Sequence, residues 1–286
     1  MFPFLNLWNS KKILKQITSD FVKSKNKRIN INISKATMKN KIILIFAFVF
    51  STPLMSFNNI LQFEPVAIIE LFTSQGCSSC PSADRLLSQT INDAKKDGKN
   101  IIALSFHVDY WNRLGWADPF SDKKYSQRQS EYASTMQLES VYTPQMIVNG
   151  NSEFVGSSQS NLESALDKSL NTKPTAVFKT LAAAIQNGNP PNVKYELDGN
   201  FSGCKINFAL VSLNETTSIK RGENEGRILK SENVVRQFIS TPANSNGEIN
   251  FEKNPVPALN NMAIIAYVQS SDLKIIGAAM AQLKNN

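Results

Sequence analysis

The sequence predicts an α/β domain over residues 64–173, followed by a small antiparallel β-sandwich domain over residues 174–286. The first part reads as strand, helix and strand, which is the unit of a parallel sheet covered by helices. After Pro174 the chain holds short strand-like segments separated by Gly, Asn and Pro turns, a pattern typical of antiparallel β-domains. We therefore expect two halves of different architecture.

The strand–helix–strand unit opens the α/β domain. Residues 64–74 are a nearly continuous apolar run, which indicates a strand buried on both faces. Residues 81–96 carry apolar side chains at helical spacing and end at Asp97-Gly98. Residues 100–109 are a second apolar run and indicate the second strand of the unit. The crossover that joins two parallel strands through a helix should be right-handed.

An insertion at residues 108–140 interrupts this pattern. It starts as an aromatic-rich loop and continues as a polar helix that Ser121 or Asp122 caps. Asn149-Gly150 then gives a strong signal for a hairpin turn, and an amphipathic helix closes the half. We expect the later strands in the segments 175–186, 192–199, 205–214, 233–240, 247–252, 262–269 and 274–283.

The first 56 residues read as a leader that is absent from the mature protein. From Met38 the chain shows a basic start, a short apolar stretch and a polar exit, so we expect a signal peptide over residues 38–56. We expect residues 1–37 to come from a start codon placed too early. The apolar stretch is shorter than the roughly 20 residues that span a bilayer, although an N-terminal membrane anchor remains the alternative. The sequence predicts a periplasmic or secreted protein without a stable membrane span after cleavage.

The positive charge of the chain belongs mainly to this leader. The first 56 residues hold 10 of the 31 basic residues and one of the 23 acidic residues. The remaining 21 basic and 22 acidic residues leave the mature chain nearly neutral. Net charge therefore gives no support for binding to nucleic acid.

Cys77 and Cys80 follow the first predicted strand and are three positions apart. This spacing lets two sulfur atoms approach each other at the start of a helix. Unpaired N–H groups at a helix N-terminus favour the thiolate, so we expect Cys77 to be the accessible, ionised nucleophile. Cys80, one turn further and more buried, is the expected resolving thiol. A structural disulfide or a metal site remain open alternatives, although zinc would need two further ligands and the chain offers one other cysteine and one histidine.

Four segments resemble a known family: "ELFTSQGCSSCPSAD", "FHVDYWNRLGWADPF", "VYTPQMIVNG" and "RGENEGR". They are similar to secreted bacterial thioredoxin-like proteins of domain of unknown function 1223. The resemblance covers nearly all of residues 66–286. It implies a thioredoxin-like α/β domain with a helical and aromatic insertion, and a cis bond between Thr143 and Pro144 that faces the cysteine pair. It also implies that Glu70 matches the buried acid beneath a thioredoxin site, although an edge carboxylate facing solvent is as good an interpretation.

His107 is the only histidine of the chain and ends the second predicted strand. It is a candidate proton carrier for Cys80 or a metal ligand beside Cys77, oriented by Asp109. An imidazole packed beneath the insertion is the equally good structural interpretation. Cys204 lies within a strand-like segment, and we expect it to be a buried free thiol without a catalytic role.

Other residues are candidates for contact with a substrate. Trp111 and Trp116 are candidates to line a groove, and the alternative is that they pack the insertion. Arg221 and Arg227 lie in the segment "RGENEGR", for which a solvated turn is the default. If this loop packs on the first domain, the two arginines become candidates to bind an acidic group.

The expected function is that of a periplasmic or secreted thiol–disulfide oxidoreductase. It would act on protein or small-molecule disulfides and thiols, and the sequence indicates no cofactor. A copper carrier that uses Cys77, Cys80 and His107 is one alternative. A thioredoxin-fold binding module without turnover is another.

Overall fold

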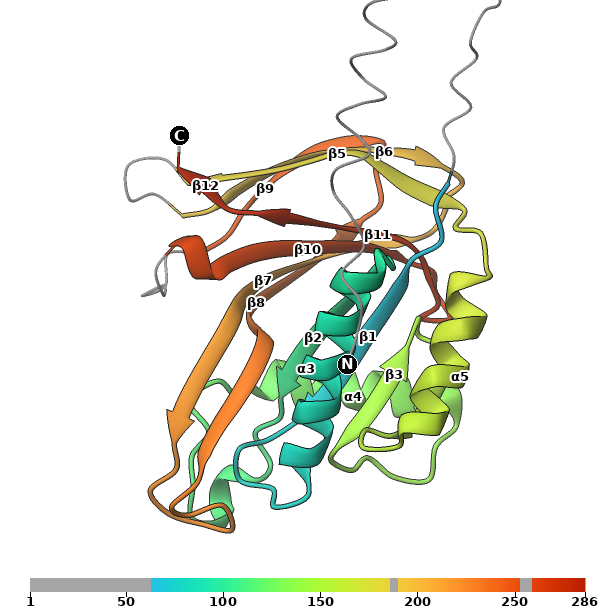
Figure 1. Cartoon of the computed structure of the whole chain (residues 1–286). Helices are drawn as coiled ribbons and strands as arrows, with labels where there is room; N and C mark the ends of the chain where they lie inside the picture. Colours follow the sequence, from blue (N-terminus) through green and yellow to red (C-terminus); the bar gives the residue numbers. More distant parts are fainter. Residues whose placement is uncertain (1–62, 186–189, 253–258, 286) are drawn as a thin grey trace, which may run out of the picture. The chain divides into compact units, whose positions relative to one another are not determined.

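A computed structural model describes residues 63–185, 190–252 and 259–285. Within residues 60–286 the chain forms one compact unit that contains two sheets. The large sheet has eight strands in the order β11-β10-β7-β8-β2-β1-β3-β4, and the small sheet has the order β12-β5-β6-β9 (Figure 1). The predicted leader, residues 1–56, lies outside the described residues.

The predicted strand–helix–strand unit is present. β1 (Ala67–Thr73) and β2 (Ile101–His107) are parallel, and α3 (Cys80–Asp97) joins them. All seven residues of β1 are buried, which explains its unbroken apolar run. Gly98, with a left-handed φ of 66°, ends α3 as a C-cap.

The hairpin and the insertion also form as the sequence predicts. β3 (Gln145–Val148) lies antiparallel to β1 and pairs with β4 (Ser152–Val155) around Asn149-Gly150. The insertion contains a short 3-10 helix, η2 (Asn112–Leu114), and α4 (Lys123–Met136). The Asp122 side chain caps α4 by accepting from the backbone N–H of Lys124. α5 (Gln159–Leu170) follows β4.

Eight strands follow α5, one more than expected. The additional strand, β12, lies at the C-terminal end, and a 3-10 helix, η3 (Leu259–Asn261), precedes β10. The bounds of the strands are β5 (Ala176–Ile185), β6 (Asn192–Gly199), β7 (Lys205–Ser218), β8 (Ile228–Pro242), β9 (Asn246–Asn250), β10 (Met262–Gln269), β11 (Ile275–Gln282) and β12 (Lys284–Asn285).

The boundary that we expected near Lys173-Pro174 does not separate two sheets. β8 pairs with β7 and, at Val234, also lies parallel to β2 at Ser105. β2 would otherwise be an edge strand with unpaired backbone groups, and the long β8 covers that edge. Four strands of the predicted β-sandwich therefore extend the α/β sheet, and the other four form the small sheet.

Three apolar clusters hold these layers together. α4 packs on one face of β1 and β2, where Phe72 stacks on Phe106 with ring centroids 5.5 Å apart. α3 and α5 cover the opposite face of the same strands. The third cluster joins the small sheet to β7 and β10.

Within the described part of the chain, no helix is both long enough and apolar enough to cross a bilayer.

Candidate functional site

The two cysteines form a tight turn between β1 and α3. The backbone N–H of Cys77 donates to Ser74 O at 3.2 Å, and that of Cys80 donates to Cys77 O at 3.3 Å. α3 begins at Cys80, so this residue lies at the helix start and not one turn inside as predicted. Cys77, Cys80 and Cys204 are all free thiols. Cys204 is half-buried just before β7 and lies apart from this turn.

The environment separates the acidities of the two thiols strongly. A hydrogen bond from Cys80 lowers the pKa of Cys77 to about 5. Burial opposes this shift, and hydrogen bonds with Ser79 and Thr143 add to it. The distance from Cys77 Sγ to Ser79 Oγ is 3.1 Å. Burial, together with its neighbour Cys77, raises the pKa of Cys80 far above its ordinary value. At neutral pH the pair therefore holds one thiolate, on Cys77, and one thiol, on Cys80.

The predicted accessibility of Cys77 is wrong. Its exposed fraction is 1%, and that of Cys80 is 0%. The tip of the β7–β8 hairpin, residues 219–227, lies against the cysteine turn. From this tip Asn224 donates to the carbonyl oxygens of Gln75 and Cys77, both at 2.9 Å. A long-range contact that local sequence does not encode thus accompanies the burial of Cys77.

Thr143 and Pro144 lie beside Cys77, as predicted. The bond between them is cis. Cys77 Sγ lies 3.8 Å from the carbonyl oxygen of Thr143. Trp111 donates from Nε1 to Thr143 Oγ1 at 2.8 Å, so this half-buried indole borders the same site. Trp116 donates to Gln75 Oε1 at 3.1 Å and therefore holds the loop that precedes Cys77.

The acid beside Cys80 is Asp84, which the sequence analysis did not identify. Thr73 at the end of β1 donates to Asp84 Oδ1 at 3.1 Å. Burial raises the pKa of Asp84 to about 7, with His107 opposing the shift. The charge of Asp84 in turn contributes to the high pKa of Cys80. Asp84 follows Cys80 by four positions on one helix, a spacing that places both side chains on the same face.

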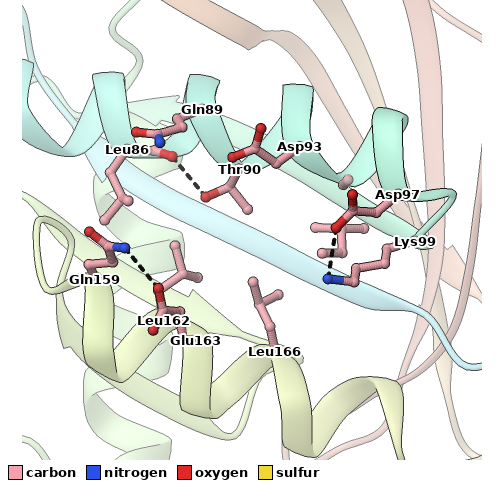
Figure 2. Close-up of a pocket in the computed structure, with 12 residues that line it drawn as sticks. Leu86, Gln89, Thr90, Asp93, Asp97, Lys99, Gln159, Leu162, Glu163 and Leu166 are labelled. Atoms are coloured by element: carbon pink, nitrogen blue, oxygen red, sulfur yellow. Dashed lines mark hydrogen bonds and ion pairs between the residues drawn. The ribbon is translucent and has the colours of Figure 1, made fainter. Parts of the chain in front are cut away.

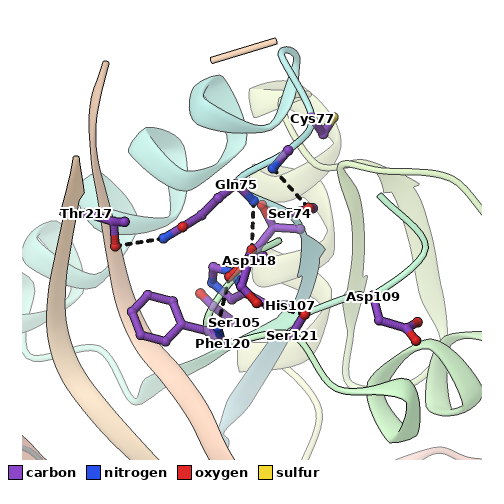
Figure 3. A network of polar contacts seen from close by, with 12 residues as sticks. Ser74, Gln75, Cys77, Ser105, His107, Asp109, Asp118, Phe120, Ser121 and Thr217 are labelled. Atoms are coloured by element: carbon purple, nitrogen blue, oxygen red, sulfur yellow. Dashed lines mark hydrogen bonds and ion pairs between the residues drawn. The ribbon is translucent and has the colours of Figure 1, made fainter. Parts of the chain in front are cut away.

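His107 is fully enclosed and is held by Asp118 rather than by Asp109. Figure 3 shows Gln75 and His107 converging on Asp118, whose Oδ2 lies 2.7 Å from His107 Nδ1 and accepts from Gln75 N at 2.8 Å. Burial alone would lower the pKa of His107, but the charge of Asp118 and its hydrogen bond raise it overall. His107 Nε2 has no hydrogen-bond partner among the described residues. Asp109 instead accepts from Ser126 Oγ at 2.6 Å.

Glu70 does not lie beneath the cysteines. Its Oε1 accepts from Arg128 Nη2 of α4 at 2.7 Å, and Tyr267 also donates to it. Strand residues alternate between the two faces of a sheet, so Glu70 faces α4 while Thr73, three positions later, faces α3. Glu70 is therefore part of a buried ion pair within the core, on the opposite face from the cysteine helix.

The loop "RGENEGR" contacts the cysteine turn through residues other than its arginines. Glu223 Oε2 accepts from the backbone N–H of Ser78 at 3.0 Å. Arg227 donates to Asn224 Oδ1 at 3.0 Å and so supports the loop itself. The side chain of Arg221 is exposed and has no recorded hydrogen bond or ion pair to the described residues. The loop packs on the first part of the chain, as the conditional prediction required. Neither arginine contributes to the described hydrogen bonds with the cysteine turn, and the binding of an acidic group by Arg221 and Arg227 stays a prediction.

The hollow shown in Figure 2 is separate from the cysteine turn. It has a volume of about 320 Å³ and lies between the C-terminal half of α3 and α5. Its lining includes Thr90, Asp97 and Glu163 but neither cysteine. Among the residues that the structure describes, no group of three or more His, Cys, Asp or Glu side chains is arranged to hold a metal ion. The predicted copper ligands therefore do not converge.

Comparison with known proteins identifies the family. The model described as "Protein of unknown function (DUF1223)" matches residues 68–269. The chain belongs to the DUF1223 family. This DUF1223 chain is similar to a crystal structure of an Agrobacterium tumefaciens protein, with 26% identity, a TM-score of 0.58, and coverage of 78% of this chain and 99% of that one. A domain of the outer membrane lipoprotein Omp28 from Porphyromonas gingivalis also matches, with 10% identity, a TM-score of 0.22, and coverage of 40% and 91%. The search of curated proteins found no match.

Proposed function

We propose that this DUF1223 protein is a thiol–disulfide oxidoreductase in which Cys77 is the nucleophile and Cys80 the resolving thiol. The observation that carries the proposal is the placement of two free thiols in one turn beside the cis bond at Pro144, with the pKa of Cys77 lowered to about 5 and that of Cys80 raised. A thiolate is the reactive form of cysteine, and a retained proton keeps the second thiol available for a later step.

A thioredoxin-like unit is part of the proposal. Its support is the strand order β2-β1-β3-β4, with β1 and β2 parallel and β3 and β4 antiparallel to their neighbours. The cysteine turn at the β1–α3 junction and the cis bond before β3 fit the same arrangement. The insertion that carries Trp111, and the extension of the sheet by β8, would distinguish this unit from simpler members of that fold.

The reaction would proceed in two exchanges. The Cys77 thiolate attacks one sulfur of a substrate disulfide, forms a mixed disulfide and releases the other sulfur as a thiolate, which takes up a proton. Asp84 then accepts the proton of Cys80, and the Cys80 thiolate attacks Cys77 Sγ. The second substrate sulfur leaves as a thiolate, and Cys77 and Cys80 become a disulfide. Two electrons thus pass from the protein to the substrate, and the reverse sequence oxidises a dithiol.

Asp84 suits the role of base in this second exchange. Its pKa of about 7 lets it bind and release a proton near neutral pH, and its charge acts on Cys80. Action outside the cytoplasm is also part of the proposal, because the leader pattern from Met38 directs a chain to an oxidising compartment, where disulfides persist.

Trapping of mixed disulfides tests the proposal. Cys80→Ser should accumulate mixed disulfides that non-reducing gels resolve, because the resolving thiol is gone. Cys77→Ser should accumulate none. Cys204→Ser is the matched control and should behave as the wild type. Equal trapping by the Cys77 and Cys80 variants, or none by either, contradicts the assigned roles and favours a binding module without turnover.

A further inference from the structure

The reactive sulfur of this site is enclosed. Cys77 has an exposed fraction of 1%, although its turn lies at a junction between a strand and a helix where Ser78 and Ser79 are exposed. A buried sulfur cannot meet the disulfide of another molecule unless a covering element moves. Three elements from elsewhere in the chain pack on this turn: the segment at Thr143, the insertion at Trp111, and the hairpin tip, residues 219–227, which bonds to the backbone of Cys77 and Ser78.

We propose that the hairpin tip is a gate over Cys77. Asn224 anchors the tip to the cysteine turn and Glu223 acts as its latch. Only a partner that displaces the tip reaches Cys77. The proposal deepens the proposed function by assigning residues that determine access to its nucleophile. It rests on that function only in taking Cys77 as the reacting sulfur.

Asn224 is the buried anchor of the gate. Its exposed fraction is 1%, and its amide group donates to the carbonyl oxygens of Gln75 and Cys77. Arg227 donates to the amide oxygen from the other side. All of these partners lie in the cysteine turn or in the tip itself, so Asn224 fixes one to the other. Its side chain provides a donor for the carbonyl group of Gln75 and a second donor for that of Cys77, which also accepts from the backbone N–H of Cys80.

Glu223 is the exposed latch. Its carboxylate accepts from Ser78 N at 3.0 Å, and both residues are solvent-exposed, so water can replace this bond when the tip lifts. Gly222 and Gly226 flank the contact residues with left-handed φ angles of 81° and 80°, which glycine adopts without steric cost. A side chain at Gly222 would place its Cβ 3.3 Å from Trp116 Cβ and 3.4 Å from Leu114 O, so the tip lies close to the insertion at this glycine.

The gate would make reactivity depend on an equilibrium between closed and open tips. In the closed form the ionised Cys77 is protected from small oxidants and alkylating reagents. In the open form Ser78 N–H is free to donate a hydrogen bond to a carbonyl or carboxylate oxygen of the partner. Weakening the latch should therefore raise the rate of every reaction at Cys77, without any change in the thiolate itself.

The rate of alkylation by iodoacetamide tests the gate in the reduced full chain carrying Cys204→Ser. At pH 8, where the Cys77 thiolate is fully formed, Glu223→Ala should raise the rate constant roughly 2- to 10-fold, the factor that one ordinary hydrogen bond contributes. Glu223→Gln keeps an oxygen acceptor for Ser78 and should remain near the starting rate. Glu225→Ala is the matched control, since Glu225 is exposed in the same loop and its side chain has no recorded contact with the cysteine turn.

Three results would overturn the gate: an unchanged or lower rate for Glu223→Ala, an equal rise for Glu223→Gln or Glu225→Ala, or a change confined to the pH midpoint of alkylation. Peptide mass spectrometry assigns the modification to Cys77. Alkylation needs no disulfide exchange, so the outcome is separate from the trapping experiment. A raised rate for Glu223→Ala with no trapping by Cys80→Ser would keep the gate and remove the oxidoreductase.

Discussion

Replacing Asp84 with Asn should stabilise the protein and slow its proposed reaction. The ordinary pKa of an aspartate is 3.8, and burial raises that of Asp84 to about 7. The folded state therefore holds a proton on Asp84 over a pH range in which the unfolded state has released it. Between these two pKa values, wild-type stability falls as the pH rises, because the folded state binds more protons than the unfolded state.

The size of this effect follows from the difference between the two pKa values. The values 3.8 and about 7 differ by about three pH units. At about 1.36 kcal/mol per unit, the ionised Asp84 costs the folded state about 4 kcal/mol above pH 7. Asn carries no charge at any pH, so Asp84→Asn should recover up to about 4 kcal/mol above pH 7 and progressively less as the pH falls. Below about pH 4 the two proteins should be equally stable, because Asp84 is then protonated in both states.

Urea unfolding of both proteins under reducing conditions at pH 4, 6 and 8 measures this difference. Asp93→Asn is the matched control, because Asp93 lies on the same helix with an exposed side chain paired to Lys96. Its stability should stay within about 1 kcal/mol of the wild type at every pH. An Asp84→Asn protein that is no more stable than the wild type at pH 8, or whose gain does not shrink on acidification, would refute the account of Asp84.

Two further predictions concern other charged groups. Alkylation of Cys77 should show a half-maximal rate near pH 5. Ser79→Ala should move this midpoint upward because it removes a hydrogen bond to the sulfur. A wild-type midpoint between about pH 8 and 9, the range of an ordinary cysteine, would contradict the assignment of the thiolate to Cys77. Glu70→Gln leaves Arg128 charged and unpaired in the core, so urea unfolding should show a loss of about 3–5 kcal/mol, and a loss below about 1 kcal/mol would contradict a buried ion pair.

The sequence predicts individual elements well because their signals are local. The apolar segment 262–269 becomes β10 with the same bounds, and Asn149-Gly150 turns the β3–β4 hairpin. Strand partners are set by contacts between distant segments, which local patterns do not contain. The pairing of β8 with β2 therefore had no local signal in the sequence. We expected one sheet to end and another to begin near residue 174, but the large sheet contains strands from both sides of this residue.

The candidate site shows the same division. The cysteine turn, the cis bond at Pro144 and the place of His107 at the end of β2 follow from local motifs. Asp84 carries a local signal as well, since it lies one helical turn after Cys80, and the alternation of strand faces already separates Glu70 from that helix. Asp118 and Asn224 have no such signal. They reach the site through an irregular loop and a distant hairpin.

The reduction potential of the Cys77–Cys80 pair tests the central claim most directly. Equilibration with glutathione redox buffers, followed by acid quenching and thiol labelling, gives the fraction of disulfide at each potential. The proposed function predicts one two-electron transition between these cysteines, with a midpoint in the range of exchange-active proteins, about −120 to −270 mV. A midpoint below about −300 mV, which is typical of structural disulfides, or a failure of Cys77 and Cys80 to form a disulfide would contradict it.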